Sequence, residues 1–156
     1  MPVPAALAIA VTFVWLGMVL AISFLEAPLK FRARGVTLPV GLAIGRLVFR
    51  VLNTVECVLA VVLAVALVLD RARSDGQVLD HGPGTPFVWA AVAVVSLVVQ
   101  VVLVRPGLAR RTDAVLASDA PQSVPRSSAH LWYVATEVTK VVGLAVAGVL
   151  LLATAL

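Results

Sequence analysis

The sequence predicts an all-α integral membrane protein, folded as a four-helix bundle with both termini outside. Three observations predict this fold class. The 156 residues are 62% hydrophobic and only 13% charged, so the chain is far more apolar than a soluble domain of its size. Four long apolar runs approach the roughly 20 residues with which an α-helix crosses a hydrocarbon core of about 30 Å. In each run the few polar residues fall on one helical stripe, which is typical of helices that surround a polar interior.

The first apolar run starts close to the first residue of the chain. No basic residue precedes it and it is too long for the apolar part of a secretory signal, so we expect it to remain as the first span. We expect a single transmembrane domain over residues 1–156, with spans at about 4–25, 47–69, 87–104 and 131–156. Along the first span, the polar stripe consists of Thr12, Ser23, Glu26 and Lys30.

The second span carries the most basic of the four stripes. Its stripe consists of Arg46, Arg50, Asn53 and Cys57, with Glu56 on its flank. Gly41 and Gly45 form a GxxxG pattern at the start of this helix, which permits a close approach of another helix. Cys57 is the only cysteine of the chain, so the sequence excludes an internal disulfide.

The third and fourth spans complete the polar interior. The third carries Ser96 and Gln100 on one side. The stripe of the fourth consists of His130, Tyr133, Glu137 and Lys140, which project within about 80° of one another.

Basic residues in the loops predict the orientation of the bundle. The first loop region contains Lys30, Arg32, Arg34 and Arg46, and the third contains Arg105, Arg110, Arg111 and Arg126. By the positive-inside rule these two loops are cytoplasmic and both termini lie outside. We expect the membrane to be a bacterial-type plasma membrane.

This orientation places the four polar stripes in the cytoplasmic half of the membrane. The expected buried polar cluster consists of Glu26, Arg50, Asn53, Glu56, Gln100, His130, Tyr133, Glu137 and Lys140. The outer half is nearly pure Val, Leu and Ala, which disfavours a continuous channel. We therefore expect either a blind, inward-facing pocket or a buried ion-pair network, in which Glu137, Glu56 or both compensate Lys140.

A metal site is the alternative interpretation of this cluster. Glu56, His130 and Glu137 offer oxygen and nitrogen ligands to a divalent transition metal. The sequence has no ExxH or HxxxH pair on one helix, however, and Lys140 would compete for the carboxylates. We therefore expect no metal and no other cofactor.

The first loop region predicts a lipid contact. Lys30, Arg32, Arg34 and Arg46 are expected at the membrane interface, where they would attract anionic headgroups. The net charge of +4 is dispersed between apolar runs and forms no nucleic-acid-binding face. The expected partners are therefore membrane lipids, together with a membrane-protein partner or further copies of the chain.

Part of the chain also resembles a known group of membrane proteins. The segment Trp15-Leu16-Gly17 through Phe24, Pro28 and Phe31, followed by Gly41, Gly45, Phe49 and Asn53, resembles the first two spans of the small four-helix membrane proteins grouped with transmembrane protein 205. His130 is similar to a late histidine of that group. The resemblance implies a four-helix membrane protein without an established reaction, in a family linked to drug or metal tolerance.

Two functional hypotheses follow from the sequence. The first is a non-enzymatic membrane protein that acts as a binding, transport-accessory or complex-forming subunit. The sequence contains no catalytic triad, phosphate loop or nucleotide fingerprint, which favours this hypothesis. The alternative is a membrane-embedded enzyme or metal-binding redox protein that uses Glu56, Glu137 and His130.

Overall fold

The computed structural model describes residues 1–73, 85–104, 106–107, 110 and 129–155. Of these residues 93% are helical and none lies in a strand. The described part of the chain contains four helices that are long and apolar enough to cross a membrane. The predicted fold class, a helical membrane protein with four spans, is confirmed.

The first span is a continuous helical rod with turns of different width. It consists of α1 (Val3–Val19), the π-helical segment η1 (Leu20–Glu26), α2 (Ala27–Leu29) and the 3-10 turn η2 (Lys30–Arg32). Pro28 explains the wide turns of η1, because proline lacks the N–H that an α-helix needs at this point and its ring displaces the preceding carbonyl groups. Gly35, with a positive φ of 84°, then turns the chain back.

The second span is α3 (Leu38–Arg73), and it starts well before the predicted boundary near residue 47. Proline is tolerated in the first turn of a helix, so Pro39 does not prevent this early start. With 36 residues, α3 is roughly 54 Å long. It therefore extends beyond a hydrocarbon core of about 30 Å.

The third span consists of α4 (Pro86–Val99) and the π-helical segment η3 (Gln100–Val104), and the fourth span is α6 (Ala129–Ala155). Like η1, η3 precedes a proline, Pro106, by two residues. The two wide-turn segments therefore have the same physical cause.

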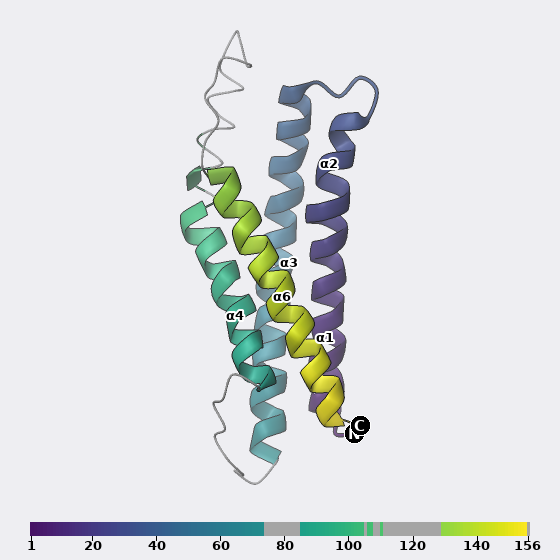
Figure 1. Ribbon diagram of the computed structural model, residues 1–156, viewed down its shortest axis with the longest axis vertical. Helices are drawn as coiled ribbons and strands as arrows, with labels where there is room; N and C mark the ends of the chain where they lie inside the picture. The colour runs from purple at the N-terminus through teal and green to yellow at the C-terminus, as the bar shows by residue number, and fades with distance from the viewer. Residues whose placement is uncertain (74–84, 105, 108–109, 111–128, 156) are drawn as a thin grey trace.

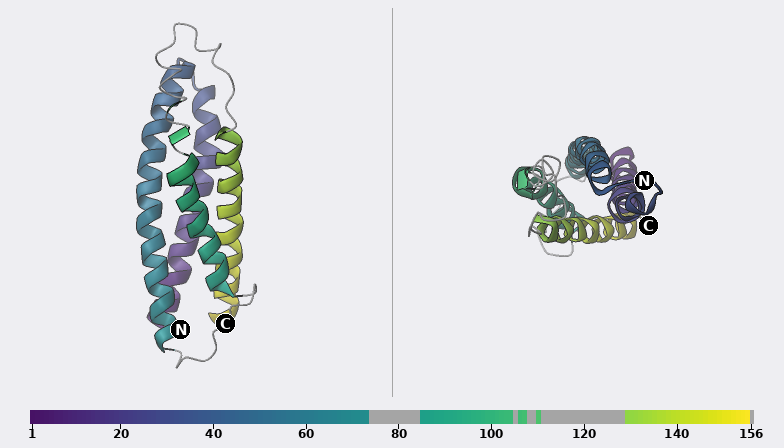
Figure 2. Two further views of the ribbon diagram at one scale, coloured as in Figure 1. Left: turned by 90° about the vertical axis from the view of Figure 1, so that its left-hand side faces the viewer. Right: turned by 90° about the horizontal axis from the view of Figure 1, so that it is seen from above.

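Consecutive spans run antiparallel, so both termini lie at one end of the bundle (Figure 1). We call this end the terminal end, and we call the opposite end, where residues 33–37 join η2 to α3, the loop end. α6 is tilted, lying beside α4 toward the loop end and beside α1 toward the terminal end (Figures 1 and 2). The tilt separates α6 from the first span at the loop end.

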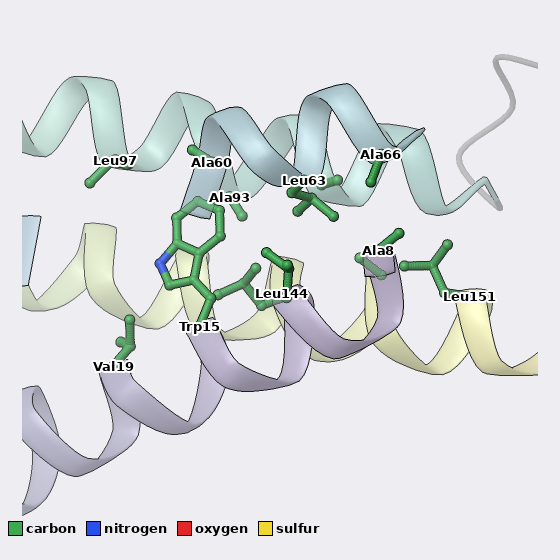
Figure 3. Close-up of a cluster of buried hydrophobic side chains, with 13 residues drawn as sticks. Ala8, Trp15, Val19, Ala60, Leu63, Ala66, Ala93, Leu97, Leu144 and Leu151 are labelled. Carbon is green, nitrogen blue, oxygen red and sulfur yellow. The ribbon is translucent and has the colours of Figure 1, made fainter. Parts of the chain in front are cut away.

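An apolar core fills the terminal half of the bundle (Figure 3). Small residues dominate it, and its buried members are Ala8, Val11, Trp15, Val19, Ala60, Leu63, Ala66, Ala90, Ala93, Leu97, Leu144, Ala147 and Leu151. α4 and α6 pack closely at Gly143, where an added Cβ would lie 3.0 Å from the carbonyl oxygen of Trp89. This tight packing closes the terminal half to a polar path.

The outer surface carries many exposed valines and leucines, whereas several charged side chains are buried inside the bundle. Val61, Val65 and Val68 of α3 are more than half exposed, whereas Lys140 and Glu56 are fully buried. In water this arrangement would be unfavourable, but in a bilayer the exposed valines face lipid. The distribution of polarity thus agrees with an integral membrane protein.

Candidate functional site

Lys140 lies at the centre of a buried polar cluster between the spans. Its Nζ donates hydrogen bonds to Glu56 Oε1 at 2.6 Å and to Gln100 Oε1 at 2.7 Å. The same Nζ lies 3.2 Å from Glu137 Oε2. An unpaired ammonium would be costly at this depth, and here three oxygen acceptors surround it. The predicted compensation of Lys140 is confirmed, and both carboxylates contribute to it.

Glu137 accepts three hydrogen bonds on a single oxygen. Its Oε1 accepts hydrogen bonds from Tyr133 Oη at 2.6 Å, Gln100 Nε2 at 2.8 Å and Ser23 Oγ at 3.2 Å. Its Oε2 is buried and, among the described residues, accepts no hydrogen bond, although Lys140 Nζ lies nearby. One oxygen of Glu137 is therefore saturated and the other is not.

Glu56 joins the cluster to the apolar core. Its Oε1, which accepts from Lys140, also accepts from Trp15 Nε1 at 2.9 Å. The groups around Asn53 fix the orientation of its amide. The amide nitrogen faces two acceptors and donates to the Phe49 carbonyl oxygen at 3.1 Å and to Glu56 Oε2 at 3.3 Å. Figure 3 shows the Trp15 nitrogen pointing away from Ala8, toward the side of the core where Val19 and Leu97 lie.

Helical spacing and the two wide-turn segments together position these groups. Tyr133, Glu137 and Lys140 lie on one face of α6 because residues at i, i+4 and i+7 align. Ser23 lies within η1 and Gln100 begins η3, so both π-helical segments direct a polar side chain at Glu137. Wide helical turns of this kind are frequent at functional sites.

The charges of the cluster do not balance. Glu56 and Glu137 supply two carboxylates and Lys140 supplies one ammonium, so the formal charge is −2 + 1 = −1 when all three are ionised. The side chains of all three are at most 1% exposed. Because a buried net charge is unfavourable, the cluster favours the binding of one further positive charge.

A cavity of about 830 Å³ borders the cluster on the side of the loop end. Glu137, Tyr133, Ser23 and Asn53 form part of its wall. The rest of the wall is largely apolar and includes Phe24, Pro28, Leu42, Phe49, Val101 and Val134. The tilt of α6 leaves room for this cavity between the helices.

Three basic residues, Lys30, Arg46 and Arg50, also line the cavity. The Nζ of Lys30 lies 5.2 Å from the ring centroid of Phe49 and 3.5 Å from Glu26 Oε2. An added Cβ at Gly45 would lie 2.9 Å from this Nζ, so glycine provides the space for the lysine. The cavity therefore combines apolar walls with an excess of positive charge.

The structure corrects the expected cluster at α3. Arg50 was expected inside but is exposed, and Cys57 is exposed as well. At about 100° per residue, Arg46, Arg50 and Cys57 lie roughly 80–120° from Glu56. The buried face of α3 is centred on Glu56, which the sequence pattern placed on the flank. This rotation pairs the carboxylate with Lys140 and leaves the arginines toward the cavity and the surface.

Two further expectations change at the loop end. Glu26 is half-buried and pairs with Lys30 instead of joining the cluster. The expected direction of Glu26 assumed 100° per residue, and the wide turns of η1 advance by a smaller angle per residue. The side chain of Lys30, expected at the lipid surface, is only 9% exposed. Arg32, Arg34 and Arg46 are exposed, in agreement with a surface position. His130 lies in the first turn of α6, and its side chain is outside the described part of the structure.

Two donors of the cluster, Trp15 and Ser23, were not predicted from the sequence. Trp15 lies midway along the first apolar run, and a buried indole N–H generally has an acceptor, which is the signal that the sequence offers. Ser23 was on the polar stripe of the first span, but its contact with Glu137 depends on the wide turns of η1. Neither partner was predictable from spacing alone.

The geometry disfavours the expected metal alternative at Glu56 and Glu137. The ammonium of Lys140 contacts both carboxylates and thus occupies the position that a bound cation would need. His130 begins α6 seven residues before Glu137, roughly 10 Å away along the helix. Within the described residues, no three His, Cys, Asp or Glu side chains are grouped for a metal.

No family model, curated protein or solved structure matches this chain. The resemblance to transmembrane protein 205 therefore stays a prediction. The function has to be inferred from the cluster and the cavity.

Proposed function

We propose that this protein is a non-enzymatic membrane protein that binds an anionic lipid in the cavity at the loop end. The observation that carries the proposal is the composition of the cavity wall, which joins Lys30, Arg46 and Arg50 to an apolar surface. An anionic headgroup near the basic residues and an acyl chain along the apolar wall would satisfy both parts of this wall. Binding of this kind suits a transport-accessory or complex-forming subunit.

The size of the cavity supports an amphipathic ligand. At about 830 Å³ it lies within the range of roughly 300–1,000 Å³ that is typical of small-molecule sites. A free inorganic anion would leave most of the apolar wall unoccupied. A lipid with one or both chains in the cavity uses the wall as well as the charges.

The closed terminal half supports binding rather than conduction. Beyond the cluster, Thr12 and Ser96 hydrogen-bond to carbonyl groups of their own helices, and the apolar core follows. A polar solute would have to desolvate to continue in this direction. The cavity is therefore best interpreted as a blind site.

The basic loop end argues for a cytoplasmic position of the cavity. Lys30, Arg32, Arg34 and Arg46 lie in or close to η2 and the first turns of α3, which meet at this end, and basic residues are retained on the cytoplasmic side. In a bacterial-type plasma membrane, the cytoplasmic leaflet would supply the anionic lipid. The same basic residues thus support both the cytoplasmic position of the cavity and the anionic lipid as its ligand.

The first test measures charge recognition. Purified protein in a zwitterionic detergent is titrated calorimetrically with dihexanoyl phosphatidylglycerol, and with dihexanoyl phosphatidylcholine and inorganic phosphate as controls. We expect phosphatidylglycerol to bind in preference to both controls. Lys30→Gln with Arg46→Gln should weaken its binding by about 2 kcal/mol, a factor on the order of 30. The matched control is Arg71→Gln with Arg73→Gln at the other end of α3, which should leave affinity unchanged.

The second test measures occupation of the cavity without changing charge. Ala27 lines the cavity, whereas Ala21, on the same rod, is exposed on the outer surface. Ala27→Trp should therefore abolish binding of dihexanoyl phosphatidylglycerol, and Ala21→Trp should not. Equal affinity of the two variants, or equal affinity for the anionic and zwitterionic lipids, would contradict the proposal.

A further inference from the structure

The cluster and the cavity share several residues, and one of them is a carboxylate. Glu137 belongs to the buried cluster and also lines the cavity. The cluster carries a formal charge of −1 when its three ionisable members are charged. A positive charge that reaches Glu137 from the cavity would neutralise it.

We propose that Glu56, Lys140 and Glu137 bind one exchangeable proton, and that anionic lipid in the cavity promotes its uptake. The ligand of this second site is the proton itself, and its route to Glu137 is the cavity. The coupling to lipid rests on the proposed function, whereas the proton site rests on the cluster alone.

The hydrogen bonds locate the proton at the pair of carboxylates. Three of the four carboxylate oxygens already accept from neighbouring donors: Glu137 Oε1, Glu56 Oε1 and, through Asn53, Glu56 Oε2. Glu137 Oε2 is buried and accepts no hydrogen bond from the described residues. A proton on this oxygen breaks no hydrogen bond, and it meets only the ion-pair contact with Lys140 Nζ at 3.2 Å among the described residues. The two carboxylates share the Lys140 ammonium, so a proton bound to either changes the charge of the whole cluster.

The other charged groups around Glu137 are distributed unevenly. On its own helix it meets Tyr133 and Lys140, and across the cluster it faces Glu56 of α3. Lys30, paired with Glu26, comes from the first span, and Arg46 and Arg50 come from α3, all on the cavity side. Gln100 of η3, which is neutral, donates a hydrogen bond to Glu137. The side chain of His130 lies outside the described part of the structure. The basic groups on the cavity side are the ones that a lipid headgroup would neutralise.

Lipid binding would alter the proton occupancy through these basic groups. In the unliganded cavity, the positive charges of Lys30, Arg46 and Arg50 partly offset the net charge of −1 on the cluster. An anionic headgroup that pairs with them removes this compensation and adds a negative charge, so the cluster gains more from binding a proton. By linkage, protonation must also strengthen lipid binding, and affinity should fall as the pH rises.

The test counts protons during binding. Dihexanoyl phosphatidylglycerol is titrated into the wild-type protein in two buffers that differ in ionisation enthalpy, at several values across the neutral pH range. The difference in apparent enthalpy gives the number of protons taken up. We expect an uptake of up to one proton per lipid, at a pH where the cluster is partly deprotonated, together with weaker binding at higher pH.

Variants assign the proton to the cluster. Glu56 does not line the cavity, so Glu56→Gln should abolish the uptake while lipid still binds. Glu137→Gln should abolish the uptake as well. Glu26→Gln is the matched control, because this glutamate lies outside the cluster, and it should leave the uptake unchanged. Binding with equal enthalpy in both buffers at every pH, or uptake that survives both cluster variants, would overturn the inference. Absence of lipid binding would instead contradict the proposed function.

Discussion

Lys140 is the residue on which the buried cluster depends. It is fully buried and lies eleven residues into α6, roughly 16 Å along the helix. Its contacts with Glu56, Gln100 and Glu137 connect α6 with α3 and with η3. Truncation of one partner of a buried ion pair leaves an uncompensated charge, which costs more than the loss of the contact itself.

Replacement of Lys140 should therefore be destabilising, and a second substitution should rescue it. We expect Lys140→Met to lower the free energy of unfolding by about 3–5 kcal/mol, because two buried carboxylates then face each other. Lys140→Met with Glu56→Gln should recover about 1–2 kcal/mol of this loss. Chemical denaturation in mixed micelles measures all the variants.

Thr139 provides the matched control for this prediction. It neighbours Lys140 on α6, but it is exposed and hydrogen-bonds to the carbonyl oxygen of Ala135 in its own helix. Thr139→Ala should change the stability little. Strictly additive effects of the Lys140 and Glu56 substitutions would show that the two charges do not interact.

The sequence predicted much of the cluster, because it indicates how deep each polar residue lies in the membrane and on which face of its helix. Glu137 and Lys140 share a face at fixed spacing, and the cost of an unpaired lysine required a carboxylate partner. Arg50 and Glu26 were misplaced because a stripe of polar residues does not state which of its members faces inward. The packing of α3 decided this, by turning Glu56 toward Lys140.

At the scale of elements, close helix approach and wide turns shape the site. α4 and α6 meet at Gly143, where the nearest neighbours are backbone atoms, whereas Gly148 faces the ring of Phe13.

The sequence predicted the four helices from hydropathy and length. It did not predict η1 and η3, because the effect of Pro28 and Pro106 on the preceding turns depends on how each helix packs.

The two glycines of α6 permit a matched prediction. Substitution by alanine gains about 1 kcal/mol of helix propensity at either position. At Gly143 the added Cβ would lie 3.0 Å from the Trp89 carbonyl oxygen and 3.2 Å from the Ala93 nitrogen, so we expect a net loss of about 1–3 kcal/mol. At Gly148 it would lie 2.9 Å from the Phe13 ring, which is 39% exposed and free to move toward lipid, so we expect little net change.

Denaturation of Gly143→Ala and Gly148→Ala in the same micelles gives the comparison. Equal stability of the two variants would indicate that α4 and α6 separate more easily than their backbone contact suggests.

At the scale of the whole molecule, the bundle is divided into an apolar terminal half and a polar loop half. Both termini lie at the terminal end (Figure 1). The cluster, the cavity and the basic residues around it lie together toward the other end. This asymmetry was expected from the distribution of Val, Leu and Ala, whereas the cavity itself depends on the tilt of α6, for which the sequence has no direct signal.

The asymmetry leads to a prediction of topology. Because basic residues concentrate at the loop end, we expect residues 33–37 in the cytoplasm and both termini outside. Fusions of alkaline phosphatase and green fluorescent protein to the C-terminus distinguish the two orientations in a bacterial host. We expect an active phosphatase and a dark fluorescent protein, and the opposite pattern would reverse the side from which lipid enters the cavity.

Lipid binding in the cavity can be observed directly by cryo-electron microscopy of the protein in nanodiscs of phosphatidylglycerol and phosphatidylcholine, with a rigid binding partner added for size. We expect lipid density inside the cavity, with the headgroup beside Lys30 and Arg46 and an acyl chain that reaches toward Tyr133. Density that is confined to the outer surface of the bundle, with the cavity closed by its own side chains, would contradict the proposed lipid site.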